Sequence, residues 1–206
     1  MKRIQTALFA LLATLCFVGC KSGEKSYLND KLYETPGMGQ ALPIRATFLD
    51  EVSWDIPHQN WGVKEWDKDF QCMKDMGINT VVMIRSGLGR WLAAPFESVL
   101  SANPNAIYPP VDLVEMFLTL ADKYDMAFFF GTYDSGQWWH EGEYQKEIDV
   151  NNALIDEVWA KYGHHKSFQG WYLSQEVSRR TKNIAKIMAA MAQRTVLRII
   201  CYSVCS

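Results

Sequence analysis

Charged side chains recur at the ends of four apolar segments of this chain. The segments read ATFLDE, VVMIRSG, AFFFGTYDS and GWYLSQE, and they end near Glu51, Arg85, Asp134 and Glu176. A buried strand has no reason to collect charges at one end unless that end faces a cleft, as the strand ends of parallel barrels do. Carboxylates at such a cleft can bind hydroxyl groups or transfer protons during hydrolysis. The pattern therefore predicts a site built from four strand ends.

Glu176 is the strongest candidate for a catalytic residue. A group that protonates a glycosidic oxygen must be a carboxylic acid with a raised pKa, held at a rigid strand end and partly shielded by aromatic side chains. Glu176 closes the segment GWYLSQE, in which Trp171 and Tyr172 precede it. The alternative role is a structural salt bridge at the rim, for example with Arg85.

Further residues near the strand ends are candidates for binding a sugar. Carboxylates and arginine bind hydroxyl groups, and aromatic side chains stack on the apolar face of a sugar ring. The candidates are Asp50, Glu51, Arg85, Tyr133, Asp134, Trp138 and Trp139, the last two in a loop predicted over 133–144. Taken singly, each charged residue could form a rim salt bridge instead, and the tryptophans could pack into the core.

Alternating strands and helices must position these side chains. The apolar segments predict strands over 44–49, 79–84, 126–132 and 168–173. Four helices follow them, and their apolar residues recur at helical spacing. These residues are Trp66, Phe70, Met73 and Met76; Val114, Phe117, Leu118 and Ala121; Leu154, Ile155, Val158, Trp159 and Tyr162; and Ile184, Ile187, Met188 and Met191. Asp112 and Glu115 form a capping-box pattern at the start of the second helix.

This alternation predicts βαβ units with a parallel sheet. A barrel and an open doubly wound sheet both use such units. No G-x-G-x-x-G fingerprint follows the first strand and no P-loop occurs, which argues against an open nucleotide-binding sheet. We therefore expect an α/β fold of the (β/α)8 TIM-barrel type, with about the first four units present in residues 41–206.

The amino terminus has the pattern of a lipoprotein signal. Lys2 and Arg3 precede a short apolar segment, and the residues LCFVGC at 15–20 resemble a bacterial lipobox. We expect a signal peptide over 1–19, lipidation of Cys20, and a tether over 20–40. A conventional cleaved signal, with Cys20 incidental, is the alternative. Lys21 favours an outer-membrane anchor in the cell envelope.

Composition excludes several partners. The 206 residues carry a formal net charge of −2 with no basic stripe, so no nucleic-acid partner is expected. Neither a CxxC pair nor an H-E-x-x-H motif occurs, so the sequence predicts no metal site and no cofactor.

Three segments carry a resemblance to a known family. TFLDEVSWDIPHQNWG, FFFGTYDSGQWW and GWYLSQEVSR resemble the bacterial lipoprotein family called domain of unknown function 4434, similar in turn to TIM-barrel glycoside hydrolases of clan A. The resemblance covers about 44–193 and implies a (β/α)8 fold and a carbohydrate-related role. It also implies that Glu176 holds the acid/base position of the fourth strand, where Gln175 replaces the usual preceding Asn.

The resemblance also implies that the catalytic nucleophile would come from a seventh strand, which this sequence does not contain. After residue 193 the chain reads RTVLRIICYSVCS and departs from the pattern of the earlier units. We expect a truncated and inactive form of a glycoside-hydrolase-like envelope lipoprotein that acts on or binds carbohydrate. The alternatives are a non-catalytic carbohydrate-binding lipoprotein and a structural envelope protein.

Overall fold

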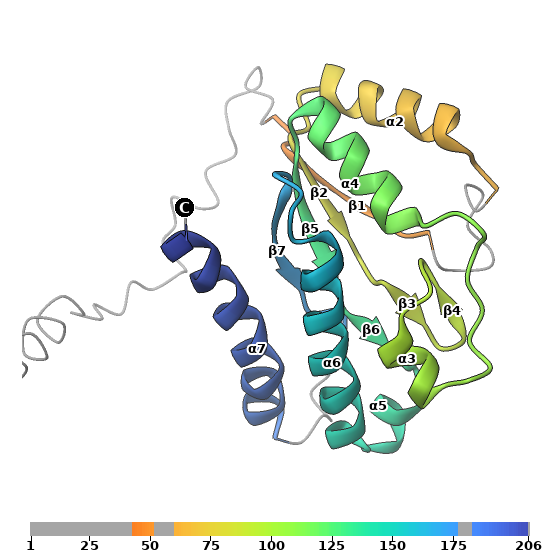
Figure 1. Ribbon diagram of the computed structural model, residues 1–206, viewed down its shortest axis with the longest axis vertical. Coiled ribbons are helices and arrows are strands. Elements are labelled where there is room, and N and C mark those ends of the chain that lie inside the picture. Colours follow the sequence, from red (N-terminus) through yellow and green to blue (C-terminus); the bar gives the residue numbers. More distant parts are fainter. Residues whose placement is uncertain (1–42, 52–59, 177–182, 206) are drawn as a thin grey trace, which may run out of the picture. The chain divides into compact units, whose positions relative to one another are not determined.

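A parallel sheet of four strands forms the centre of the structure, as the apolar spacing predicts (Figure 1). The computed structural model describes residues 43–51, 60–176 and 183–205. The sheet order is β1-β2-β5-β7, and every neighbouring pair is parallel. The strands are β1 (Ala46–Leu49), β2 (Thr80–Met83), β5 (Ala127–Gly131) and β7 (Phe168–Tyr172). The α/β class with a parallel sheet is therefore confirmed.

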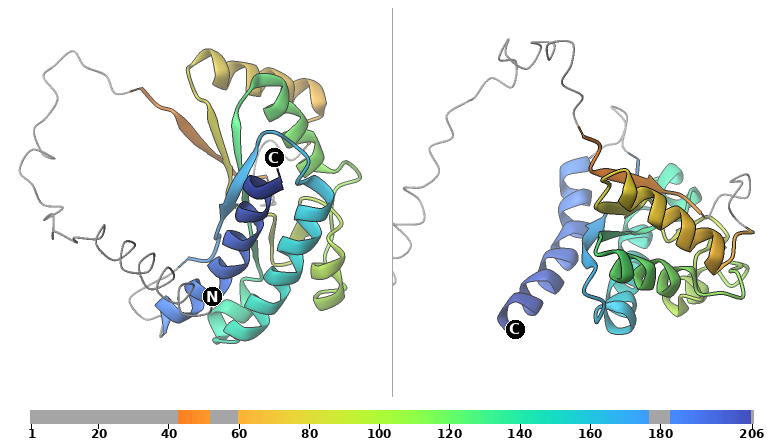
Figure 2. Two further views of the ribbon diagram at one scale, coloured as in Figure 1. Left: turned by 60° about the vertical axis from the view of Figure 1, so that its left-hand side comes forward. Right: turned by 90° about the horizontal axis from the view of Figure 1, so that it is seen from above.

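Helices α2 (Val63–Asp75), α4 (Leu113–Tyr124), α6 (Tyr144–Tyr162) and α7 (Ile184–Cys205) follow the four strands in turn. Helix α4 packs against α2, α6 packs against α7, and α4 lies across the sheet (Figures 1 and 2). The α4 helix begins as predicted, because the Asp112 carboxylate accepts a hydrogen bond of 3.0 Å from the Glu115 N–H. Met76 was expected to be buried but is 68% exposed, because α2 ends at Asp75 and Met76 lies beyond its buried stripe.

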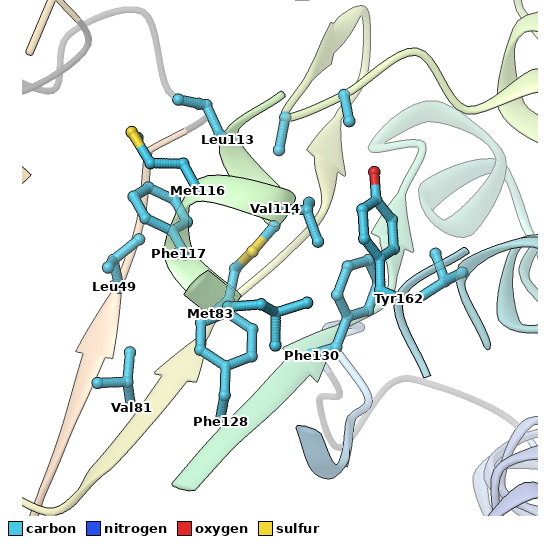
Figure 3. Close-up of a cluster of buried hydrophobic side chains, with 14 of the residues drawn as sticks. Leu49, Val81, Met83, Leu113, Val114, Met116, Phe117, Phe128, Phe130 and Tyr162 are labelled. Atoms are coloured by element: carbon cyan, nitrogen blue, oxygen red, sulfur yellow. The ribbon is translucent and has the colours of Figure 1, made fainter. Parts of the chain in front are cut away.

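The core lies between the sheet and α4 (Figure 3). Phe117 and Val114 of α4 are fully buried and pack over Met83, Phe128 and Phe130. A register shift in β7 between its pairings with Phe128 and Phe129 brings the Phe168 and Trp171 rings to 5.1 Å on the helix-facing side. Strict alternation would have placed these two side chains on opposite faces.

The sheet is strongly curved. Phe48 of β1 and Tyr172 of β7 lie on its other face, and their ring centroids are 5.4 Å apart in an edge-to-face contact. Three interstrand spacings of about 4.8 Å separate the same two strands in a flat sheet, or roughly 14 Å. The face opposite the helices is therefore concave, and Phe48 there is 59% exposed.

Short elements lie in the connections that follow β2 and β5, and the second of these includes the loop expected over 133–144. A second sheet has the order β4-β3-β6 and comprises β3 (Gly87–Leu88), β4 (Trp91–Leu92) and β6 (Tyr133–Asp134). Helices α3 (Glu97–Ala102) and α5 (Gln137–Glu141) complete these regions. Two-residue strands and single-turn helices are too short to show a hydrophobic period, so apolar spacing could not predict them.

Residues after 193 continue helix α7 as far as Cys205. Within the described part of the chain, no helix combines the length and apolar character needed to cross a membrane. The predicted signal peptide over 1–19, the lipidation of Cys20 and the tether over 20–40 lie outside the described residues.

Candidate functional site

The carboxyl ends of the four parallel strands meet at one edge of the sheet, and all the predicted strand-end residues lie there. Asp50 and Glu51 follow β1, Arg85 follows β2, Asp134 lies in β6 just after β5, and Glu176 follows β7. We call this the strand-end edge. Its two halves, after β1 and β2 and after β5 and β7, are built differently.

Ser174 and Thr132 tie three strand ends together. The Ser174 hydroxyl lies 2.7 Å from the carbonyl oxygen of Ile84 and 2.8 Å from that of Thr132. The Ser174 N–H donates to Thr132 Oγ1 at 3.0 Å. Both side chains are buried, so these bonds fix the chain after β7 against the ends of β2 and β5.

Gln175 has a structural role at the position where the family resemblance leads to Asn. Its Nε2 donates to the Tyr133 carbonyl at 2.6 Å and to Glu147 Oε1 at 3.2 Å. Its Oε1 accepts from the Thr132 hydroxyl at 3.2 Å. The side chain is only 5% exposed, and its amide group is used on both sides. Gln175 therefore holds the backbone directly before Glu176.

Glu147 and Asn151 of α6 complete this network, and sequence reasoning missed both. The Asn151 amide accepts from the Tyr133 N–H and donates to the Tyr133 carbonyl, each at 2.9 Å. Glu147 Oε1 accepts from the Ser135 N–H at 3.1 Å. Burial raises the pKa of Glu147, and the charge of Asp134 adds to this effect. Glu147 and Asn151 lie four residues apart on an otherwise apolar face of α6. That spacing was the feature of the sequence that could have predicted a buried polar network here.

Trp139 holds the backbone of Glu176 in place. The Trp139 indole N–H donates to the Glu176 carbonyl at 2.8 Å, while the Glu176 side chain is exposed to solvent. Trp139 is only 6% exposed and Trp138 only 8%, and both lie in helix α5. The expectation of a tryptophan loop over 133–144 is therefore wrong, because a short helix turns both rings inward. Trp139 is used as a hydrogen-bond donor to the backbone.

Tyr133 and Trp138 line a cavity of about 300 Å³ with Asn103, Asn105, Gln137 and Lys146. The Tyr133 hydroxyl donates to the Gly89 carbonyl at 2.6 Å, and the Lys146 ammonium lies 4.2 Å from the Trp138 ring centroid. Amide, ammonium and aromatic groups together can bind the hydroxyl groups and the apolar face of a sugar.

The half of the strand-end edge after β1 and β2 has unused polar atoms. Arg85 and Asp50 approach to 3.9 Å, a distance too long for a hydrogen bond. Asp50 Oδ1, Arg85 Nε and Ser86 Oγ are buried and have no hydrogen-bond partner among the residues that the structure describes. Such groups are available to bind a polar ligand.

Glu51 borders a cavity of about 180 Å³ that Asn60, Trp91 and Tyr108 also line. Burial, followed by the charges of Asp50 and Asp69, raises the pKa of Glu51 from 4.5 to about 8. The Glu51 carboxyl is therefore largely protonated at neutral pH, and it can donate a hydrogen bond or a proton.

These features define an α/β protein with a polar site at the carboxyl ends of a curved parallel sheet. Residues 44–203 match the family model described as "Domain of unknown function (DUF4434)", and the chain belongs to this family. The family prediction is confirmed, and the match extends ten residues beyond the expected limit of 193.

A solved structure is also similar to this chain. The chain is 51% identical to a protein from Bacteroides thetaiotaomicron VPI-5482 whose crystal structure is described as that of a "putative alpha-L-fucosidase", and the TM-score is 0.70. The match covers 77% of this chain and 49% of that protein, so the chain spans about half its length. A search of curated proteins gave no match.

Proposed function

We propose that this protein is a glycoside-hydrolase-like lipoprotein of the cell envelope that acts on carbohydrate at the strand-end edge. The observation that carries the proposal is the 51% identity to the Bacteroides protein described as a "putative alpha-L-fucosidase". The polar groups and aromatic-lined cavities at the strand ends are the kind of surface that binds sugars. An α-L-fucoside is accordingly the first substrate to test.

The chain supplies four units of a (β/α)8 barrel in this proposal. The 5.4 Å contact between Phe48 and Tyr172 supports it, because a sheet that curves this much is turning toward closure. The carboxyl ends of barrel strands are also where active sites are built.

Glu176 is the proton donor in the proposed reaction. Gln175 and Trp139 hold its backbone from two sides while its carboxyl remains exposed for contact with the glycosidic oxygen. Asp50, Arg85 and Asp134 bind sugar hydroxyl groups, and the protonated Glu51 donates a hydrogen bond to one of them.

A panel of nitrophenyl glycosides that includes the α-L-fucoside tests this role. In a longer form of the protein that supplies the remaining units of the barrel, we expect turnover that Glu176→Gln lowers by at least about 100-fold, because an amide cannot donate the proton. Glu143→Gln is the matched control, since Glu143 is an exposed carboxylate outside the site. An unchanged rate in Glu176→Gln contradicts the catalytic role.

Carbohydrate binding without hydrolysis is the second candidate function. The cavity beside Tyr133 and Trp138 favours it, because its amide and ammonium groups suit recognition and none of its lining residues is a carboxylic acid. Binding of a glycan without turnover, weakened by Lys146→Ala and unchanged by Glu176→Gln, favours this alternative. Turnover of any glycoside in the panel rules it out.

Lipidation of Cys20 anchors the protein in the proposal. Expression with a radiolabelled fatty acid tests it, and we expect label in the wild type and none in Cys20→Ser. Equal labelling of both proteins contradicts the anchor.

A further inference from the structure

A cluster of nitrogen and oxygen ligands lies away from the strand-end edge. Glu115 belongs to α4, while His164 and His165 lie in the connection between α6 and β7, at the amino end of that strand. One ligand atom from each of these three residues lies within 4.8 Å of the other two. Sequence spacing could not predict this cluster, because its members come from segments about fifty residues apart and form no known ligand spacing.

Asp122 orients the ring of His165. Asp122 Oδ2 lies 2.7 Å from His165 Nδ1, and Asp122 Oδ1 accepts from the Ser167 N–H at 2.8 Å. A carboxylate oxygen accepts, so His165 Nδ1 is the donor in the 2.7 Å contact. With Nδ1 as the donor, Nε2 is the ring nitrogen that can offer a lone pair to a metal ion.

His165 Nε2 is directed at Glu115. The His165 side chain is 7% exposed, and its Nε2 is buried without a hydrogen-bond partner among the described residues. It lies 3.4 Å from Glu115 Oε1. Nε2 can face this oxygen in two ways, either as a protonated N–H or with a metal ion between its lone pair and the carboxylate.

The geometry suits a metal ion. Zinc bonds of about 2.0–2.1 Å to nitrogen and oxygen place neighbouring ligands of a tetrahedral site roughly 3.3–3.4 Å apart. The distance between Nε2 and Oε1 already has this value. The His164 ring centroid lies 4.3 Å from that of His165, and His164 is exposed, so its side chain can rotate to complete the set.

We propose that Glu115, His164 and His165 bind a divalent transition-metal ion, with zinc as the best-fitting ion and water in the fourth position. Asp122 is the carboxylate that orients the buried histidine, as is usual for metal-binding imidazoles. The ion would join α4 to the chain that enters β7. This site is separate from the strand-end edge and does not depend on the proposed function.

Calorimetric titration of the metal-free full chain with zinc chloride tests the proposal. We expect one zinc ion per chain, and we expect His164→Ala and Glu115→Gln each to weaken binding at least about tenfold. Both residues are exposed, so the variants should fold, and circular dichroism checks this. His140→Ala is the matched control, because it removes an exposed histidine of α5.

X-ray absorption at the zinc edge provides a second measurement. Two imidazoles and one carboxylate in the first coordination sphere of the wild type support the site. Absence of stoichiometric zinc overturns the proposal, and so does equal affinity in the wild type and both ligand variants. Nitrogen-15 shifts that show His165 protonated on both ring nitrogens in the presence of zinc also overturn it, because the cluster is then an imidazolium held between Asp122 and Glu115.

Discussion

The two halves of the strand-end edge satisfy their polar groups in opposite ways. After β5 and β7, the buried Thr132, Ser174 and Gln175 bond to one another and to neighbouring backbone. After β1 and β2, Asp50, Arg85 and Ser86 keep buried polar atoms without hydrogen-bond partners in the described part of the chain. From this contrast we infer that the half after β5 and β7 stabilises the fold and holds Glu176. The half after β1 and β2 is available to a ligand.

Gly131→Ala should have the largest effect, because Gly131 joins the two halves. A Cβ there would lie 2.3 Å from the Met83 carbonyl oxygen and 2.6 Å from the Arg85 nitrogen, both backbone atoms of the neighbouring strand end. The strands must separate to admit it, so we expect a loss of at least about 5 kcal/mol in unfolding free energy, or no folded protein. Urea denaturation followed by tryptophan fluorescence measures the loss.

Gly77→Ala is the control for that variant. Gly77 has a φ of +84° but open space around its Cβ position, so the substitution should cost only about 1 kcal/mol. Similar losses in the two variants would show that the close contact of β2 and β5 is not what requires glycine at 131.

Glu51, in the half of the strand-end edge after β1 and β2, should make the unfolding free energy of the protein depend on pH. Its pKa is 4.5 in the unfolded chain and about 8 in the folded one, so the folded state retains a proton that the unfolded state loses. The contribution of Glu51 is therefore most favourable below pH 4.5 and is lost as the pH rises to about 8. A shift of this size corresponds to a loss on the order of 4 kcal/mol across that window.

Glu51→Gln tests this dependence, because the amide does not titrate. Unfolding free energies at pH 5, 6, 7 and 8 should show the variant gaining on the wild type with each step. Glu143→Gln should follow the wild type throughout, since that carboxylate is exposed. A constant difference between Glu51→Gln and the wild type would mean that Glu51 titrates normally.

Asn151→Ala should destabilise the half that holds Glu176. The substitution leaves the buried Tyr133 N–H without its acceptor and removes two donated bonds, to the carbonyls of Tyr133 and Glu147. We expect a loss of about 3 kcal/mol in urea denaturation. Asn152→Ala is the control, because the buried Asn152 Oδ1 has no partner among the described residues, and we expect it to change stability by less than about 1 kcal/mol.

The sequence predicted the backbone framework better than the site. Regular spacing revealed the parallel strands, and Asp112 revealed the start of α4, since both signals are local. The placement of Trp138 and Trp139 depends on how a single-turn helix packs, and no local signal records that. Glu147, Asn151 and the cluster at His165 depend on contacts between segments far apart in the chain, which a single sequence does not display.

Asp50→Asn should separate ligand binding from stability with the smallest structural change. The Asp50 carboxylate lies 3.9 Å from the Arg85 guanidinium, and the Asp50 side chain is 28% exposed. Loss of the charge should therefore lower the unfolding free energy by less than about 1 kcal/mol. If this half is built for a ligand, glycan affinity should nevertheless fall at least about tenfold, because the sugar loses an ionised acceptor. Asp67→Asn removes a carboxylate of α2 outside the site and should leave affinity unchanged. A large loss of stability with unchanged affinity in Asp50→Asn would reverse the assignment and make Asp50 and Arg85 a structural pair.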